Sequence, residues 1–167
     1  PDDVAVDSAG NLWIPDFYSH RVVKYDQDGN YMTQLGVTWE PGSDNDHFNQ
    51  PVGIALDSTG NIYVSDDLNN RIQIFDSSGV YSATLGSFGS GDYEFNTPRH
   101  LTFDGDGNLY VADGLNHRVQ IFDSQLAYIA TLGVTGEPGE DNDHLNWPRG
   151  VAVDEDTIYV ADSDNHR

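Results

Sequence analysis

One stretch of sequence is written four times in this chain, and its clearest copy is Asp113-Gly-Leu-Asn-His-Arg-Val-Gln-Ile-Phe-Asp123. The other copies are Asp16-Phe-Tyr-Ser-His-Arg-Val-Val-Lys-Tyr-Asp26, Asp66-Asp-Leu-Asn-Asn-Arg-Ile-Gln-Ile-Phe-Asp76 and the shorter Asp162-Ser-Asp-Asn-His-Arg167. Self-similarity at a period of about 20 to 50 residues indicates a chain built from stacked structural units. The fold is therefore predicted in units of this repeat.

A proline opens each unit, at Pro1, Pro51, Pro98 and Pro148, so that the spacings are 50, 47 and 50 residues. We divide the chain accordingly into repeats 1–50, 51–97, 98–147 and 148–167, of which the last is incomplete. The whole chain is then one repeat region with no second domain.

Each complete unit predicts four short strands, which in the second unit cover residues 53–57, 61–65, 71–75 and 80–85. These segments are rich in β-branched and aromatic residues and are bounded by Gly, Asn, Asp and Ser. The first two are almost continuous apolar runs, which predicts that the first strand lies innermost. Four-stranded units of this length predict an all-β fold, a β-propeller of antiparallel blades with three complete blades and half of a fourth.

The composition is strongly acidic, with 28 Asp and Glu against 7 Lys and Arg and a formal net charge of -21. Nucleic acid is disfavoured as a partner, because phosphates are bound by Lys and Arg that release their counterions. No apolar run reaches the roughly 20 residues that span a bilayer, so membrane insertion is not predicted. There is no cysteine. The compartment stays open, with a slight preference for an extracellular or cell-surface location.

The repeated aspartates and arginines are interpreted as structural, because a residue type present in every unit does the same local work in each. Each aspartate is predicted to cap its turn and to pair with the arginine five residues later: Asp16 with Arg21, Asp66 with Arg71, Asp113 with Arg118 and Asp162 with Arg167. The histidines between them share that interpretation, because Asn70 replaces histidine in one copy.

These motifs resemble the NHL repeat, which is named after an Asn-His-Leu box. Asn116-His117-Arg118 and Asn165-His166-Arg167 match the box with Arg in third place, and the segments Pro51 to Asp57 and Pro148 to Asp154 match the opening. The resemblance implies a propeller that usually closes with six blades. We therefore expect this chain to be a segment of a longer protein that supplies the remaining blades.

Functional positions are expected where the repeats disagree. Just after the opening prolines lie Asp2, Arg99, His100 and Arg149, which are predicted to contact an anionic or polar ligand at the channel mouth. The alternative is that they bond to loops of the neighbouring blade. Large aromatic side chains replace smaller ones in some copies and predict either a recognition surface or filled blade junctions: Trp39, Trp147 and Tyr18.

Two matching loops carry carboxylates close together and are the candidates for calcium, which takes six to eight oxygen ligands. Their acidic residues are Asp44, Asp46, Asp141 and Asp143. The alternative is an ordinary turn before an apolar anchor, here Phe48 and Leu145. No other cofactor is predicted.

The leading functional hypothesis is a non-catalytic propeller scaffold that binds a protein, a peptide or a small polar ligand through loops at the channel mouth. The alternative is a metal-dependent propeller enzyme, similar either to the peptidylglycine amidating lyases or to the lactonases. The resemblance to the lyases implies zinc held by histidines directly after the opening prolines. None of Asp2, Val52, Arg99 and Arg149 is a histidine, and His100 stands one place late.

Overall fold

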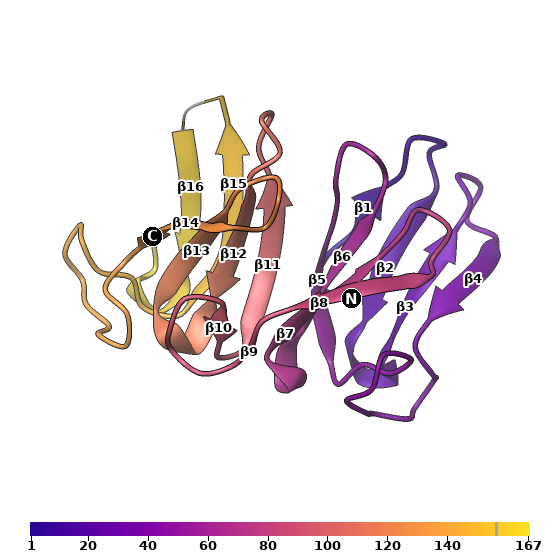
Figure 1. Cartoon of the computed structure of the whole chain (residues 1–167), viewed down its shortest axis with the longest axis horizontal. Coiled ribbons are helices and arrows are strands. Elements are labelled where there is room, and N and C mark those ends of the chain that lie inside the picture. Colours follow the sequence, from indigo (N-terminus) through magenta and orange to yellow (C-terminus); the bar gives the residue numbers. More distant parts are fainter. Residues whose placement is uncertain (156) are drawn as a thin grey trace.

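The computed structural model describes residues 1–155 and 157–167, and these contain three four-stranded antiparallel sheets and two two-stranded sheets, one antiparallel and one parallel (Figure 1). The strands of the first two blades are β1 (Ala5–Val6), β2 (Leu12–Asp16), β3 (Arg21–Tyr25), β4 (Tyr31–Leu35), β5 (Pro51–Leu56), β6 (Ile62–Asp66), β7 (Arg71–Phe75) and β8 (Tyr81–Leu85). Those that follow are β9 (Ser87–Phe88), β10 (Glu94–Phe95), β11 (Pro98–Phe103), β12 (Leu109–Asp113), β13 (Arg118–Phe122), β14 (Tyr128–Leu132), β15 (Pro148–Asp154) and β16 (Thr157–Asp162).

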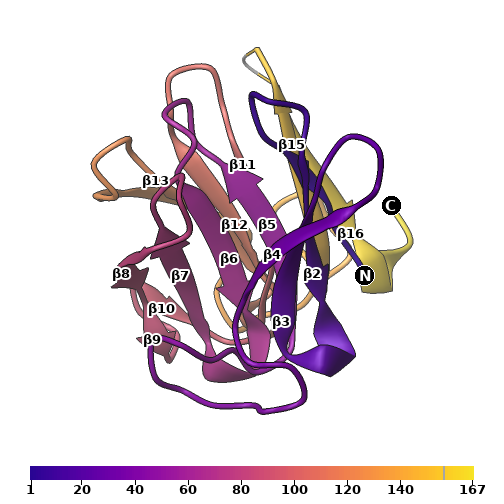
Figure 2. The same ribbon diagram turned by 90° about the vertical axis from the view of Figure 1, so that its right-hand side faces the viewer.

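The sheets follow one another in chain order, with β1–β4 at one end and β15–β16 at the other (Figures 1 and 2). Their first strands adjoin, since β5 contacts both β1 and β11, and β11 contacts β15. The predicted innermost position of the first strand is therefore confirmed. The architecture is that of β-propeller blades, three of them complete and the fourth represented by its two inner strands.

The helical content of the described residues consists of four 3-10 turns of three residues, η1 (Phe17–Ser19), η2 (Asp67–Asn69), η3 (Gly114–Asn116) and η4 (Ser163–Asn165). The turns η1, η2 and η3 each join the second strand of a blade to the third, and η4 follows β16; the turns lie at the lower end of the sheets in Figure 1. No helix in the described parts of the chain is long and apolar enough to cross a membrane.

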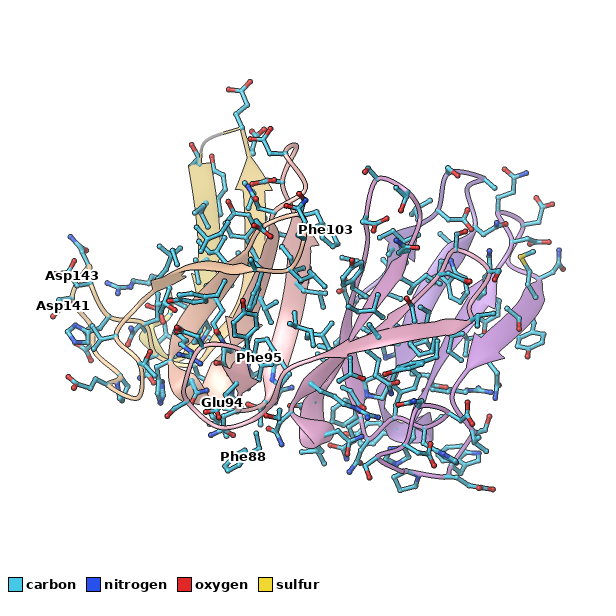
Figure 3. The ribbon with its side chains drawn as sticks, viewed as in Figure 1. Phe88, Glu94, Phe95, Phe103, Asp141 and Asp143 are labelled. Carbon is cyan, nitrogen blue, oxygen red and sulfur yellow. The ribbon has the colours of Figure 1, made fainter. Side chains whose placement is uncertain are left out.

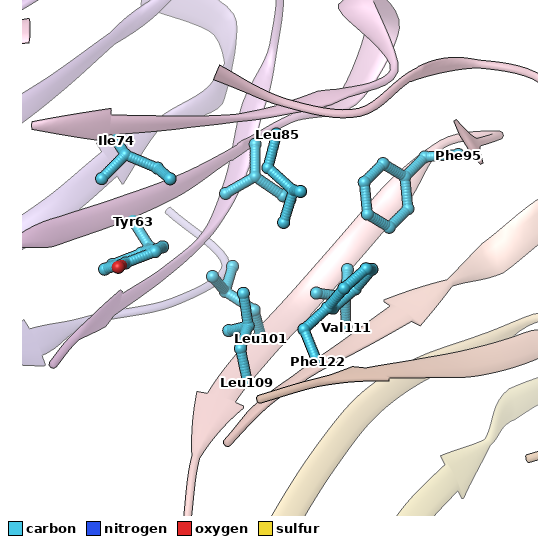
Figure 4. Packing of buried hydrophobic residues seen from close by; sticks show 9 residues of the cluster. Tyr63, Ile74, Leu85, Phe95, Leu101, Leu109, Val111 and Phe122 are labelled. Carbon is cyan, nitrogen blue, oxygen red and sulfur yellow. The ribbon is translucent and has the colours of Figure 1, made fainter. Parts of the chain in front are cut away.

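The core lies between blades rather than within one. In the largest cluster, Tyr63, Ile74 and Leu85 of the second blade face Leu101 and Phe122 of the third (Figure 4). All five side chains are buried, and Phe95 from the connection packs on the Phe122 ring with 6.1 Å between the ring centroids. Each blade therefore needs its neighbour to cover its apolar face, as expected of a repeat architecture.

Three of the innermost strands, β5, β11 and β15, begin with a bulge. In the third blade Pro98 pairs with Asp113 and the next pair is Leu101 with Val111, so that two residues of β11 stand opposite Ala112 alone. The same irregularity follows Pro51 and Pro148. A bulge turns side chains away from the regular alternation of a strand, often beside a functional site. In β11 the bulged residues are Arg99 and His100, which are positions where the repeats disagree.

Candidate functional site

The repeated Asp–Arg pair, called the brace below, is best developed in the third blade. Arg118 Nε lies 2.8 Å from Asp113 Oδ2, and the two side chains are 2% and 0% exposed. The guanidinium also donates hydrogen bonds to the carbonyl oxygens of Ser90, Gly91 and Glu94 in the connection from the preceding blade, at 2.8 to 2.9 Å. The brace therefore fixes one blade to the chain segment that leaves the blade before it.

The predicted pairing is confirmed in all four copies, with Nε–Oδ2 distances of 2.8 to 3.1 Å. Arg71 and Arg167 donate to the preceding connection as Arg118 does. Arg21 differs, because its guanidinium donates to Gln34 and Thr38 of its own blade.

The prediction that the aspartate caps the turn is wrong, because none of the four turns has a side-chain cap from it. Asp113 Oδ1 instead accepts from the backbone N–H of Asn96 at 2.7 Å, and Oδ2 accepts from the Asn116 amide and from Arg118. Oδ1 is thus directed back toward the connection, while Oδ2 is held by side chains of its own blade. Burial raises the pKa of Asp113, while these hydrogen bonds act in the opposite direction.

The second box position, held by His117 or Asn70, joins a blade to the next one. His117 has a left-handed backbone with φ 55°, and its Nδ1 accepts the backbone N–H of Trp147 at 3.2 Å. Asn70 has φ 54°, and its Oδ1 accepts the equivalent N–H of Thr97 at 2.9 Å. Asn and His both tolerate this backbone and both offer an acceptor, which explains why Asn70 can replace histidine.

The structure brings the four predicted ligand-binding residues together. They line one hollow of about 390 Å³, here called the mouth hollow, at the start of the innermost strands. Its lining consists of Asp2, Asp3, Val52, Gly53, Arg99, His100, Arg149, Gly150 and Ala161. Its volume lies in the range of small-molecule sites. Ligand binding in the mouth hollow stays a prediction.

One wall of the mouth hollow is a stack of two guanidinium groups on one indole. The Arg149 guanidinium carbon lies 4.2 Å from the Trp147 ring centroid, and that of Arg99 lies 5.7 Å away. A cation within about 6 Å of an aromatic face is attracted to it. Gly114 makes room for the indole, since a Cβ there would lie 2.9 Å from Trp147 Cδ1 and Nε1.

Asp67 is a site residue that the sequence analysis did not single out. It is 2% exposed, and its Oδ2 lies 3.5 Å from Arg99 Nη1. Within the described residues, its Oδ1 and Arg99 Nε have no hydrogen-bond partner. Burial raises the pKa of Asp67 to about 6, although the Arg99 charge lowers it in part. The available signal was an aspartate where other copies carry Phe17, Gly114 or Ser163.

The opposite wall of the hollow carries Asp2 and Asp3. Asp3 is engaged within the fold, because its Oδ1 accepts from the Val4 N–H and its Oδ2 from the Ile54 N–H, both at 2.8 Å. His100 Nε2 lies 3.7 Å from Asp3 Oδ2, and its Nδ1 accepts from Val151 N at 3.5 Å. His100 thus contacts strand β15 of the next blade and Asp3 of the first blade, and its role in ligand binding stays a prediction.

The three predicted recognition aromatics are not equivalent. Tyr18 in η1 is 77% exposed and Trp39 in the first connection is 69% exposed. Trp147 is half-buried between the two arginines, and its Nε1 is buried without a partner among the described residues. Trp147 therefore fills a blade junction, while Tyr18 and Trp39 are free to contact a partner.

The calcium candidates lie on two exposed loops, and Figure 3 shows Asp141 and Asp143 on a loop that projects from the sheets. Asp44 Oδ1 lies 2.6 Å from His47 Nδ1, and this hydrogen bond raises the pKa of His47. Asp141 and His144 repeat the arrangement at 2.6 Å. The carbonyl oxygens of Ser43 and Asp44 accept from Arg71. Calcium binding there stays a prediction.

The donor set at the mouth does not fit the zinc that the lyase resemblance implies. Zinc in an enzyme needs three protein ligands around an open position. In the described parts of the chain, no three His, Cys, Asp or Glu side chains come together in a possible metal group.

The NHL repeat family matches this chain at residues 48–75, 95–122 and 145–167. Each match begins at the apolar anchor before an opening proline, namely Phe48, Phe95 or Leu145, and the first two end with the third strand of the blade. The matched segments thus contain the brace, the box and the bulged innermost strand.

Curated and solved relatives are similar over different lengths. The peptidylglycine alpha-amidating monooxygenase of Rattus norvegicus is 37% identical over 57 residues, which are 32% of this chain and 6% of that protein. A protein of unknown function from Bacteroides thetaiotaomicron superposes with a TM-score of 0.78 at 19% identity, over 98% of this chain and 45% of the other. A catalytically inactive virginiamycin B lyase from Staphylococcus aureus, solved with quinupristin, gives 0.70 at 15% identity, over 99% and 50%.

The chain thus spans about half the length of these solved structures and a small part of the curated relative. At such identities the solved structures establish the likeness of fold alone.

Proposed function

Because this chain is built from NHL repeats, we propose that it is a non-catalytic propeller scaffold whose mouth hollow binds a small polar ligand or a peptide through an anionic group. A carboxylate is the group that fits best. The brace and the box residue, which recur in the blades, hold neighbouring blades together. The residues that differ between blades are therefore the ones available for recognition.

The observation that carries the proposal is the state of Arg149. Six of the seven basic side chains form ion pairs: Arg21, Lys24, Arg71, Arg99, Arg118 and Arg167. Arg149 is exposed in the mouth hollow, and it makes no ion pair with any residue that the structure describes. Stacking on Trp147 holds its planar fork in place, and this fork matches a carboxylate in geometry.

The experiment is a calorimetric titration of the protein with butyrate, a minimal carboxylate, at low ionic strength. Butyrate should bind, and Arg149→Gln should weaken binding roughly tenfold, because a hydrogen bond to a charged group contributes about 1.5 to 3 kcal/mol. Arg21→Gln, an arginine outside the hollow, is the matched control and should leave binding unchanged. Equal binding to wild type and Arg149→Gln would contradict the proposal.

The second candidate is a metal-dependent enzyme, and the 37% identity to an amidating monooxygenase over 57 residues favours it. It predicts that the protein, isolated without chelators, contains a stoichiometric metal and converts a peptidylglycine or lactone substrate. Activity that is lost with the metal and restored with it would replace the scaffold proposal. Calcium on the two acidic loops is tested separately, by a calcium titration of wild type and of the Asp141→Asn, Asp143→Asn double variant.

A further inference from the structure

The acidic wall of the mouth hollow carries one carboxylate with no described partner. Asp3 is held by two backbone N–H groups and lies near His100. Asp2 beside it is exposed and makes no side-chain hydrogen bond or ion pair with the residues that the structure describes. The hollow therefore has one free carboxylate on this side.

The basic wall is divided in the same way. Arg99 faces the buried carboxylate of Asp67 at 3.5 Å, whereas Arg149 has no such partner among the described residues. One free cation and one free anion thus line the same hollow, contributed by the first and fourth blades.

The floor between these walls is short of side chains. Val52 is 7% exposed, and Gly53 carries no side chain because a Cβ there would lie 2.4 Å from the Arg99 carbonyl oxygen. Gly150 and Ala161 complete the lining with at most a methyl group. This floor offers an apolar surface with few hydrogen-bonding groups of its own.

We propose that the ligand of the mouth hollow is a small zwitterion, such as an amino acid, with its carboxylate on Arg149 and its ammonium group on Asp2. The aliphatic part of the ligand lies over Val52, Gly53 and Ala161. This inference rests on the proposed function and adds the second charge. A dianion is repelled by Asp2 and a simple amine by Arg149, so that the unpaired charges also select against other ligands.

The test compares three probe series of increasing chain length: ω-amino acids from glycine to ε-aminocaproate, the fatty acids, and the alkylamines. Calorimetry on the wild-type protein should give the tightest binding for one ω-amino acid, roughly fivefold to tenfold tighter than the fatty acid of the same length. The alkylamines should bind most weakly of the three series, because they lack the carboxylate that Arg149 recognises.

Two variants separate this inference from the proposed function. Asp2→Asn should remove the preference for the ω-amino acid and should not weaken fatty-acid binding, because it also removes a charge that repels the carboxylate, whereas Arg149→Gln should weaken the binding of both. Both side chains are exposed, so the fold should persist, which an unchanged urea midpoint checks. Fatty acids that bind as tightly as ω-amino acids at every length would overturn the zwitterion and keep the carboxylate site. No binding by either series would overturn the proposed function itself.

Discussion

The braces of the first and third blades have the same sequence pattern and different surroundings. In the first blade Asp16 and Arg21 are 33% and 25% exposed, and their contact is 3.1 Å long. In the third blade Asp113 and Arg118 are almost fully buried at 2.8 Å. The difference is the connection from a preceding blade, whose carbonyl groups surround Arg118.

The comparison predicts that ion pairs with the same sequence pattern contribute differently to the stability of different blades. A partly exposed pair contributes about 1 kcal/mol or less, because water screens it. A buried pair costs much more to break, because removal of one partner leaves an unpaired charge in the interior. Repetition in the sequence therefore does not imply equal contribution to stability.

The largest effect should come from removing the two arginines in turn. Arg118→Ala should lower the free energy of unfolding by about 3 to 5 kcal/mol, since Asp113 then stays buried without its cation. Arg21→Ala should cost about 1 kcal/mol or less. Urea unfolding followed by circular dichroism measures both. Equal losses would show that burial does not set the difference between the blades.

A second prediction concerns the pH dependence of stability that arises from Asp67, which lacks the hydrogen bonds that hold Asp113. The folded pKa of Asp67, about 6, lies above the value in the unfolded chain, so between about pH 4 and pH 6 the folded state keeps a proton that the unfolded state has lost. Stability from this group falls as the pH rises through that window. Asp67→Asn should therefore gain stability relative to wild type, from near zero at about pH 4 to roughly 2 to 3 kcal/mol at about pH 8.

The matched control for that prediction is Asp2→Asn, which removes an exposed carboxylate and should change the unfolding free energy by about 0.5 kcal/mol or less. Thermal unfolding across this pH range measures both variants. A constant Asp67→Asn difference from pH 4 to pH 8 would show that Asp67 is ionised in the folded protein as it is in the unfolded chain.

A third prediction uses the position after the brace aspartate, which is Phe17 in the first blade and Gly114 in the third. Gly114→Ala should cost about 1 to 3 kcal/mol, because the new Cβ would overlap the Trp147 indole. Gly105→Ala, with no atom within 4 Å of its Cβ, should change stability by about 0.5 kcal/mol or less. Adding Trp147→Gln to Gly114→Ala should restore most of the loss, since Gln50 is the counterpart of Trp147 in the first junction.

The smallest effect concerns the box residue that the first and third blades share. His117→Asn should change the unfolding free energy by roughly 0.5 kcal/mol or less, because Asn70 accepts the same bond with the same left-handed backbone. His117→Ala should cost about 1 to 2 kcal/mol, because alanine lacks the acceptor and disfavours that backbone. A loss as large for Asn as for Ala would indicate a role of the imidazole beyond the hydrogen bond.

Much of the fold can be predicted from the sequence, because the same pattern of strands and turns recurs in every repeat. The strands predicted at 53–57, 61–65, 71–75 and 80–85 agree with β5 to β8 to within two residues at each end. The Asp–Arg pairs follow from their constant spacing of five residues. The direction in which the aspartate side chains point does not follow from the sequence. It depends on backbone groups far from them in the chain, such as the N–H of Asn96, which lies 17 residues before Asp113.

The sequence predicts several of the residues that line the mouth hollow, and it does not predict the contacts between them. Asp2, Arg99, His100 and Arg149 were found because the copies disagree at those positions. The ion pair of Arg99 with Asp67 could not be foreseen, since it joins a turn of one blade to the bulge of the next. The clearance that Gly114 leaves for Trp147 likewise depends on packing between units that no single repeat reveals.

The contacts of each brace run backwards along the chain. Arg71, Arg118 and Arg167 all bind carbonyl groups that lie 23 to 28 residues earlier. On the ribosome, domains form from the amino terminus onward at about 5 to 20 residues per second, so the arginine that fixes a connection follows it within a few seconds. The contacts of each such arginine therefore need only chain that has already been synthesised.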